Sequence, residues 1–488
     1  MRYLVLLLCF FPLQITAQPL QETVQQKLNI PALQGAWWGG MAAYVDEPQQ
    51  TLFAVQGNQR MAPASTLKLL TTAAALHTLG PQHRFETRLY ISTPPDNNGV
   101  LRGDVIVRGG GDMTLGSTRV KGSTRYQDVL NQWVKALQHA GIRRIEGTLY
   151  ADTSLFEGPT IADKVNWENM GNYFAAPASA LSFNDNLFAI HFKGELSGNK
   201  LAEVAATEPQ IPGVELQSFV TTDAVSKKDN AYVYGAPDQY NLKIFGSIPT
   251  TLTGFTIKAA MPNPALFTVQ ALKQALQEAG IEVVGAPQVL AMKPDYSQAT
   301  LLHTIQSPAL KDILIIINKR SFNLYADMLL RHLALADGQP GTIRNGLQAL
   351  NKFLRENQIA NENDAVIYDG SGLSRDNMIT PQVLVNTLHF MAQSPYFEPY
   401  YKSLATPNDR GDLLLLRYFL KPKHQVGDVR IKGGTIDGVK AVAGYVHDKD
   451  GRLISFAMMA NNLATNKDES LWRVHEDIIK NLLEIKNR

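Results

Sequence analysis

The chain has 488 residues, 45% of them hydrophobic and 18% charged, and its 46 Lys and Arg against 44 Asp and Glu give a formal net charge of +2. This composition excludes a disordered chain, and the length exceeds what one hydrophobic core normally organises, so two or three domains are expected. Because the charge is nearly balanced and no long basic run occurs, nothing in the sequence indicates a nucleic-acid partner.

The first residues, MRYLVLLLCFFPLQITAQ, have the pattern of a secretory signal. One Arg precedes an apolar run that is too short for a membrane span, and the small residue Ala17 follows. We expect residues 1–17 to be a signal peptide cleaved near Ala17, with an uncleaved anchor as the alternative. Cys9, the only cysteine, lies inside this segment, so the mature protein would contain no disulfide and no thiolate nucleophile. Export without disulfides fits the periplasm of a bacterial cell envelope.

Neither a metal nor another cofactor is expected. The ten histidines show no HExxH and no other helical ligand pair. The segment RGGGDMTLG, residues 108–116, lacks the Lys-Ser/Thr ending of a phosphate-binding loop and is interpreted as a turn.

The predicted elements change character along the chain. The first part has strands in 36–60 and a buried helix from about Ser65 to Gly80. Short alternating strands follow from about 86 to 300, with helices near 126–140 and 268–279. Helices then dominate over 308–420 around a turn-rich 368–377, and the chain ends with strand–turn–strand in DVRIKGGTIDGVKAVAGYVHD, the strand RLISFAMMAN and a last helix. The last helix carries an apolar stripe opposite a face of mixed charge, which favours core packing over a membrane anchor; its members are Leu471, Val474, Ile478, Leu482 and Ile485. The order predicts a helix-plus-antiparallel-sheet domain that is split by a β-rich insertion.

Three short motifs could carry chemistry, and the first is Ser65-Thr66-Leu67-Lys68 at the start of the buried helix. Residues three apart share a helix face, so a serine hydroxyl and a lysine amine come within hydrogen-bond reach. A serine needs an adjacent base, and a buried lysine with a depressed pKa can be that base. A second copy of the pattern, Ser197 to Lys200, lies in a turn, so only the first copy opens an apolar helix.

The second motif, Ser-Phe-Asn, also occurs twice. The copy at residues 182–184 precedes a strand and is interpreted as a turn. The copy that contains Ser321 and Asn323 leads into an apolar helix, where the two side chains could face a cleft or cap the helix.

The third motif is Lys432-Gly433-Gly434-Thr435 at a predicted strand end. Glycines there permit close approach of a ligand to the backbone, and the lysine supplies a cation for a carboxylate. The alternative is an ordinary glycine-rich hairpin with a solvated lysine.

Ser-x-x-Lys, Ser-x-Asn and Lys-x-Gly, in that order, form the three-part set of penicillin-recognising serine enzymes. The chain resembles the penicillin-binding D-alanyl-D-alanine carboxypeptidase/endopeptidase family, the class C low-molecular-mass penicillin-binding proteins. The resemblance spans about residues 60 to 460 and rests on the stretches PASTLK, GDVIVRGGGDMTL, GTLYADTSLFEG, APASALSFNDN, NKRSFNLYADMLL, YDGSGLSRDNMITP and IKGGTIDGVKAVAGY.

The resemblance implies an α+β fold. A transpeptidase-like domain of the penicillin-binding and serine β-lactamase type, an antiparallel sheet with helices on both faces, would be built from residues 18–85 and 301–488. Residues 86–300 would form one or two inserted β-rich domains.

The resemblance also implies acyl transfer. Ser65 would attack the carbonyl between two D-alanines, with Lys68 as proton acceptor, and Ser321 would relay a proton to the leaving amine with help from Lys68 or Lys432. Asn323 would bind the peptide, and Lys432 and Thr435 would hold the terminal carboxylate beside Gly434. Backbone N–H groups of Ser65 and Thr435 would form an oxyanion hole.

Some positions depart from the family pattern. Gly433 stands where the family has Thr, Asp327 replaces the more usual Glu, and residues 403–417 match a family loop only loosely. In relatives a carboxylate of the inserted region reads the stem-peptide side chain, and Asp152 in YADTS is our candidate, with turn capping as the alternative.

The function expected from the resemblance is that of an exported D-Ala-D-Ala carboxypeptidase, endopeptidase or both, which acts on peptidoglycan stem peptides and is trapped by β-lactams. One alternative is a non-catalytic peptidoglycan- or partner-binding homologue weakened at Gly433. Another is a β-lactamase, for which no dedicated deacylating acid is evident.

Overall fold

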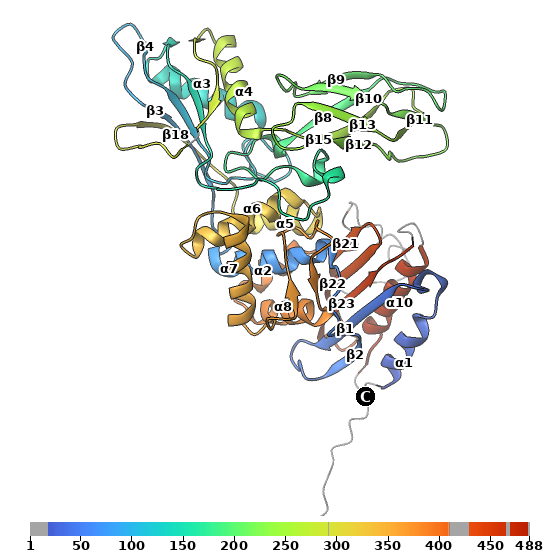
Figure 1. The fold of residues 1–488 in the computed structure, drawn as a ribbon. Helices are drawn as coiled ribbons and strands as arrows, with labels where there is room; N and C mark the ends of the chain where they lie inside the picture. The colour runs from blue at the N-terminus through green and yellow to red at the C-terminus, as the bar shows by residue number, and fades with distance from the viewer. Residues whose placement is uncertain (1–17, 291, 408, 410–428, 465–468, 487–488) are drawn as a thin grey trace, which may run out of the picture.

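The computed structural model describes residues 18–290, 292–407, 409, 429–464 and 469–486. The predicted signal segment, residues 1–17, therefore lies outside the described residues, as does most of the loosely matching stretch 403–417. Figure 1 shows two upper lobes above a lower body that contains both ends of the described chain. The chain leaves the lower body before residue 86 and returns after residue 306.

Among the described residues, five strands form the antiparallel sheet of the lower body in the order β2-β1-β23-β22-β21. Their bounds are β1 (Trp37–Tyr44), β2 (Thr51–Val55), β21 (Val429–Ile436), β22 (Val439–His447) and β23 (Leu453–Asn461). Strands from the two ends of the chain thus lie side by side, with β1 paired to β23.

Helices cover both faces of this sheet (Figure 1). On one side lie α1 (Gln18–Lys27) and α10 (Glu469–Leu483). On the other side lie α2 (Lys68–Leu79), α5 (Leu310–Lys319), α6 (Asn323–Ala336), α7 (Ile343–Glu356), α8 (Pro381–Gln393) and α9 (Phe397–Ser403), with the short hairpin β19 (Ala365–Val366) and β20 (Met378–Ile379) beside them.

The sheet is buried on both faces because successive side chains along its strands point alternately into two hydrophobic cores. In β22, Ala441 and Ala443 face the large helix layer, whereas Val442 and Val446 face α1 and α10. In α10, Leu471, Ile478 and Leu482 of the predicted stripe are buried in the second core, which confirms that this stripe packs internally. Among the residues the structure describes, no helix is long and apolar enough to cross a membrane.

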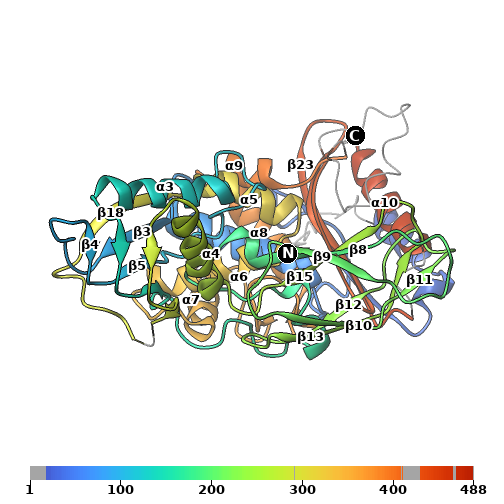
Figure 2. The same ribbon diagram turned by 90° about the horizontal axis from the view of Figure 1, so that it is seen from above.

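The upper part contains two lobes, which Figure 2 shows side by side. One lobe has the mixed sheet β17-β7-β5-β3-β18, the small parallel sheet β16-β6-β4, and helices α3 and α4. Its bounds are β3 (Glu86–Ile91), β4 (Val100–Leu101), β5 (Val105–Arg108), α3 (Tyr126–His139), β6 (Arg144–Ile145), β7 (Leu149–Asp152), α4 (Pro264–Glu278), β16 (Glu282–Val283), β17 (Gln288–Val289) and β18 (Thr300–Gln306). Helices α3 and α4 are near the predicted 126–140 and 268–279, although α4 begins earlier because Asn263 caps it and Pro264 opens it.

The other lobe consists of small sheets of short strands. They are β15-β8-β9, β10-β13-β12 and β11-β14. Their bounds are β8 (Leu187–Phe192), β9 (Val204–Glu208), β10 (Glu215–Ser218), β11 (Thr221–Asp223), β12 (Tyr232–Tyr234), β13 (Asn241–Phe245), β14 (Ser247–Pro249) and β15 (Phe255–Ala260). One hydrophobic core runs through both lobes, so they support one another.

The entry to α2 differs from the sequence prediction. A 3-10 turn, η2 (Ala64–Leu67), holds Ser65, and the regular α-helix begins only at Lys68. Ala64 has φ +46, a left-handed conformation that breaks the helical path before the serine. Because of this tight turn, Ser65 lies just before the N-terminus of the buried helix α2 rather than within its first regular turn.

Candidate active site

Ser65 and Lys68 are brought together by η2 and the first turn of α2. The Lys68 Nζ donates a hydrogen bond of 2.9 Å to the Ser65 Oγ. The Lys68 side chain is fully buried, and Leu67, Leu69 and Leu70 around it are buried too. The predicted proximity of hydroxyl and amine is therefore present in the fold.

Ser321 and Asn323 lie where the loop after α5 turns into α6. Ser321 has φ +55, so the chain reverses sharply there, and α6 begins at Asn323. Neither side chain caps α6, because Phe322 is the N-cap residue and no side-chain cap bond is formed. The helix-cap alternative is therefore wrong for this copy of the motif.

The two ends of the Asn323 amide have different partners. Its Oδ1 accepts a hydrogen bond of 2.6 Å from Lys68 Nζ, and its Nδ2 donates one of 2.7 Å to the backbone oxygen of Phe174. The contact to Lys68 orients the amine, and the direct peptide binding expected for Asn323 stays a prediction. Phe174 belongs to the segment between β7 and β8, so the upper part reaches the site.

Strand β21 presents Lys432 and Gly434 beside η2. The Lys432 side chain is fully buried, and its Nζ donates to Ser321 Oγ at 2.9 Å and to the Gly433 oxygen at 2.7 Å. The solvated-lysine alternative for this motif is therefore wrong. A Cβ on Gly434 would lie 2.8 Å from both the Pro63 oxygen and the Ser65 nitrogen, so only glycine allows this close approach.

Thr435 follows on the same strand, opposite Lys440 of β22, and its side chain is exposed. An exposed hydroxyl one residue beyond the tight Gly434 contact is available to a ligand that lies along β21. Direct contacts thus join three parts of the fold, which are η2 and α2 with Ser65 and Lys68, the start of α6 with Ser321 and Asn323, and β21 with Lys432 and Gly434.

Burial depresses the pKa of both lysines. It lowers the pKa of Lys68 to about 8, against the opposing charges of Asp327 and Asp369. The pKa of Lys432 lies well below its ordinary value because of burial and the nearby charge of Lys68. A substantial fraction of neutral amine next to a serine hydroxyl is what general-base activation of that serine requires.

The hydrogen bonds of Lys68 suit both protonation states. As an ammonium group it donates to three oxygens, those of Ser65, Asn323 and the Ser371 carbonyl. As a neutral amine it can still donate to the two carbonyl-type oxygens of Asn323 and Ser371, and its lone pair then faces Ser65. The amine can therefore accept the Ser65 proton without moving.

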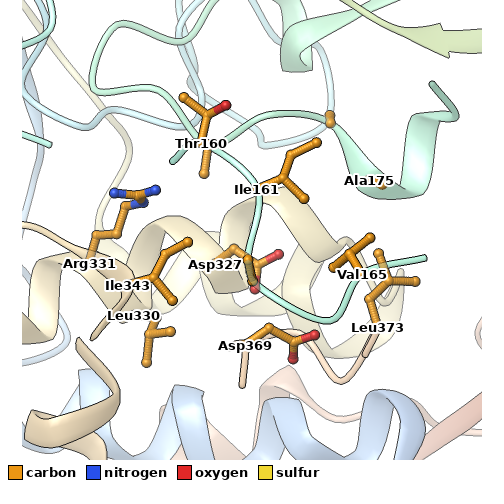
Figure 3. Close-up of a pocket in the computed structure, with 13 residues that line it drawn as sticks. Thr160, Ile161, Val165, Ala175, Asp327, Leu330, Arg331, Ile343, Asp369 and Leu373 are labelled. Atoms are coloured by element: carbon orange, nitrogen blue, oxygen red, sulfur yellow. The ribbon is translucent and has the colours of Figure 1, made fainter. Parts of the chain in front are cut away.

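The third partner of Lys68, the carbonyl of Ser371, is not among the site residues predicted from the sequence. It lies in the turn-rich stretch 368–377, which the sequence indicates only as a turn and as part of the family resemblance. Figure 3 shows the neighbouring Asp327 and Asp369 in a pocket beneath Thr160 and Ile161 of the upper part. A glycine-rich turn that begins with Asp is a signal for such a loop, but it does not indicate which carbonyl faces the lysine.

Asp152 is not brought together with these residues by any contact among the described residues. It ends β7, and it is buried with its Oδ1 accepting from Ser154 N at 2.8 Å, as in a turn cap. Its Oδ2 accepts a 2.6 Å hydrogen bond from the Tyr296 hydroxyl, and Arg108 lies 3.8 Å away. These partners all belong to the upper part.

The second copies of both motifs lie in turns of the upper part. Lys200 pairs with Glu195, and Asn199 between Ser197 and Lys200 has φ +59. At the first Ser-Phe-Asn copy, three successive residues, Asn184 to Asn186, have positive φ values, which confirms the predicted turn. No cluster of three or more His, Cys, Asp or Glu able to hold a metal ion occurs among the described residues.

The chain is similar in sequence to known D-alanyl-D-alanine carboxypeptidases. A family model described as the D-Ala-D-Ala carboxypeptidase 3 (S13) family matches residues 20–481. A D-alanyl-D-alanine carboxypeptidase of Actinomadura is 27% identical over 91% of this chain and 81% of the relative. The D-alanyl-D-alanine carboxypeptidase DacB of Haemophilus influenzae is 27% identical over 86% of this chain and 85% of the relative.

The fold is similar to that of a solved structure. The crystal structure of penicillin binding protein 4 from Haemophilus influenzae matches with a TM-score of 0.78 at 24% identity, covering 95% of this chain and 99% of the other. A complex of that protein with a β-lactam matches with a TM-score of 0.74 at 23% identity, again over 95% and 99% of the two chains. The likeness confirms the predicted α+β class with a penicillin-binding-type fold.

Proposed function

The chain belongs to the D-Ala-D-Ala carboxypeptidase 3 (S13) family, and on that premise we propose that it cleaves D-Ala-D-Ala through an acyl-enzyme on Ser65. The observation that carries the proposal is the buried amine of Lys68, 2.9 Å from the Ser65 hydroxyl. The family match and the geometry of Ser65 and Lys68 both indicate acyl transfer from a D-Ala-D-Ala peptide bond to a serine.

In the acylation step, Ser65 Oγ attacks the carbonyl carbon between the two D-alanines as its proton passes to the neutral Lys68. Backbone N–H groups of Ser65 and Thr435 receive the developing oxyanion, a type of contact worth about 3–4 kcal/mol per donor. The tight packing of Gly434 against the Ser65 nitrogen supports this assignment, because it holds β21 and η2 at a fixed separation.

In the second half, the C–N bond breaks and the leaving amine takes up a proton. Ser321 relays that proton, which comes from Lys68 directly or through Lys432, whose Nζ lies 2.9 Å from the Ser321 Oγ. Lys432 and Thr435 bind the terminal carboxylate of the substrate. Water then attacks the Ser65 ester, releases the shortened peptide and restores the hydroxyl.

The substrate, the inhibitors, the location and the domain division of the protein are part of the same proposal. Peptidoglycan stem peptides are the substrate, β-lactams imitate the dipeptide and acylate Ser65, and the protein is exported to the periplasm after cleavage near Ala17. The division into a catalytic domain of residues 18–85 and 301–488 and inserted domains of residues 86–300 is proposed on the position of β3 and β18. The buried Asp152 is kept as the candidate reader of the stem-peptide side chain.

Release of D-alanine from a stem pentapeptide tests the proposal. We expect release by the wild-type protein and none by Ser65→Ala, and cleavage of a cross-linked peptide dimer would reveal endopeptidase activity. A folded wild-type protein that releases no D-alanine would contradict the proposal and favour the non-catalytic binding protein. Rapid turnover of a β-lactam would instead favour the β-lactamase.

A further inference from the structure

Two carboxylates hold the loop whose carbonyl contacts Lys68. Within this loop, residues 369–377, Asp369 accepts hydrogen bonds of 2.7 Å from Gly372 N, 2.7 Å from Ser374 N and 3.0 Å from Asn377 Nδ2. Asp369 is 1% exposed, so these bonds fix the loop around a buried charge rather than around solvent.

The second carboxylate, Asp327, reaches the same loop from α6, one turn beyond Asn323. Its Oδ1 accepts from Gly370 N at 3.0 Å, while the Gly370 oxygen accepts from Thr71 Oγ1 at 2.7 Å. Gly370 is therefore held from both sides, by α6 through Asp327 and by α2 through Thr71. The next carbonyl along the chain, that of Ser371, is thereby directed at the Lys68 amine.

We propose that Asp327 and Asp369 are positioning residues for the general base: they hold the Ser371 carbonyl against Lys68 and supply negative charge next to its ammonium form. The inference rests on the proposed function and extends it, because the loop was not part of the three-motif set. Neither carboxylate is proposed to contact the substrate.

The charges around the amine come from every element packed against it. Asp327 lies on α6 and Asp369 on the loop, Lys432 lies on β21, and Arg331 lies one turn beyond Asp327 on α6, within electrostatic reach of it. Burial and the charge of Asp369 raise the pKa of Asp327 to about 7, and burial also raises the pKa of Asp369. Both carboxylates raise the pKa of Lys68, so together they keep the base protonated to a higher pH than burial alone would.

The test is the rate of acylation by a fluorescent penicillin, measured from pH 6 to pH 10. Neutral Lys68 is the reactive form, so the rate rises with pH through the Lys68 pKa. Asp327→Asn removes the charge but keeps an oxygen that can accept from Gly370 N. We expect the acid limb of its pH–rate profile, in which the rate rises with pH, to move down by on the order of one pH unit. At pH 7.5, where the wild-type Asp327 carboxyl with its pKa of about 7 is mainly ionised, the variant should then retain about a threefold larger share of its own plateau rate than the wild type.

Companion variants separate charge from structure. Asp327→Glu keeps the charge and should keep the wild-type acid limb. Asp369→Asn should shift the limb in the same direction but with a lower plateau, because an amide cannot accept from all three donors. The matched control is Asp376→Asn in the same loop. Asp376 is exposed and lies 4.0 Å from the Lys164 amine, and this variant should change neither the acid limb nor the plateau.

The outcomes are distinguishable. An acid limb that stays in place in a folded Asp327→Asn variant, or that moves as far in Asp376→Asn, would overturn the inference while leaving the proposed function intact. A wild-type protein that is not labelled at any pH would overturn the proposed function itself.

Discussion

At the residue scale, the chemistry depends on one buried amine that must be able to lose its proton. Lys68→Arg should abolish acylation, lowering the rate by at least about a thousandfold, because a guanidinium group does not deprotonate at neutral pH. Labelling with a fluorescent penicillin measures this. The matched control is Lys200→Arg in the second Ser-x-x-Lys copy. The Lys200 amine lies 3.6 Å from Glu195 in the upper part, and this variant should label normally. Normal labelling of Lys68→Arg would refute the assigned role.

The wild-type enzyme itself should show a pH dependence set by Lys68. Burial lowers the pKa of Lys68 to about 8, so the neutral fraction grows as pH rises through about 8. Below that value the acylation rate should fall by about tenfold for each pH unit. Stopped or quenched labelling across the pH range measures the limb, and a rate independent of pH between 6 and 8 would exclude Lys68 as the base.

At the element scale, the contact between β21 and η2 sets the geometry of the site. Gly434→Ala places a Cβ 2.8 Å from two backbone atoms, the Pro63 oxygen and the Ser65 nitrogen, so strand and turn must separate. We expect a loss of unfolding free energy of about 1–3 kcal/mol and a large loss of acylation. Thermal unfolding and penicillin labelling measure the two effects.

Gly57→Ala is the control for this strand contact, because its nearest neighbours would lie at 3.8 Å. It should cost little stability and label at the wild-type rate. If Gly434→Ala labels as fast as Gly57→Ala, the close approach of β21 to η2 is not required for acylation.

Element types followed from the sequence better than contacts did. The apolar run after Ser65 predicted a buried helix, but the left-handed Ala64 shifts its regular start to Lys68, which helix propensity alone does not reveal. The stripe on α10 predicted core packing, since period and burial agree there. The role of Ser371 could not be predicted, because it acts through a backbone carbonyl that any residue carries, and its direction is set by Asp327 from a distant helix.

At the scale of the whole molecule, the upper part is tied to the site by the segment between β7 and β8. Asn172 in this segment pairs with both backbone groups of Val233 in β12, at 3.2 Å and 2.9 Å, and Phe174 two residues later holds Asn323. The upper part therefore supports the orientation of Asn323 and, through it, of Lys68.

Asn172→Ala should loosen this connection. It leaves two backbone groups of Val233 without their buried partner, which costs about 1–3 kcal/mol, and it should slow acylation several-fold because Phe174 is less well fixed. Thermal unfolding and labelling rates measure the two effects. Wild-type labelling in a destabilised Asn172→Ala variant would show that the upper part does not influence the site.

The proposed reaction requires that Ser65 forms the acyl-enzyme, and peptide mapping of the penicillin-labelled protein by mass spectrometry locates the label. We expect one penicilloyl group on the peptide that contains Ser65, none in Ser65→Ala, and normal labelling in Ser197→Ala. A folded wild-type protein that takes up no label, or a label that persists in Ser65→Ala, would contradict it.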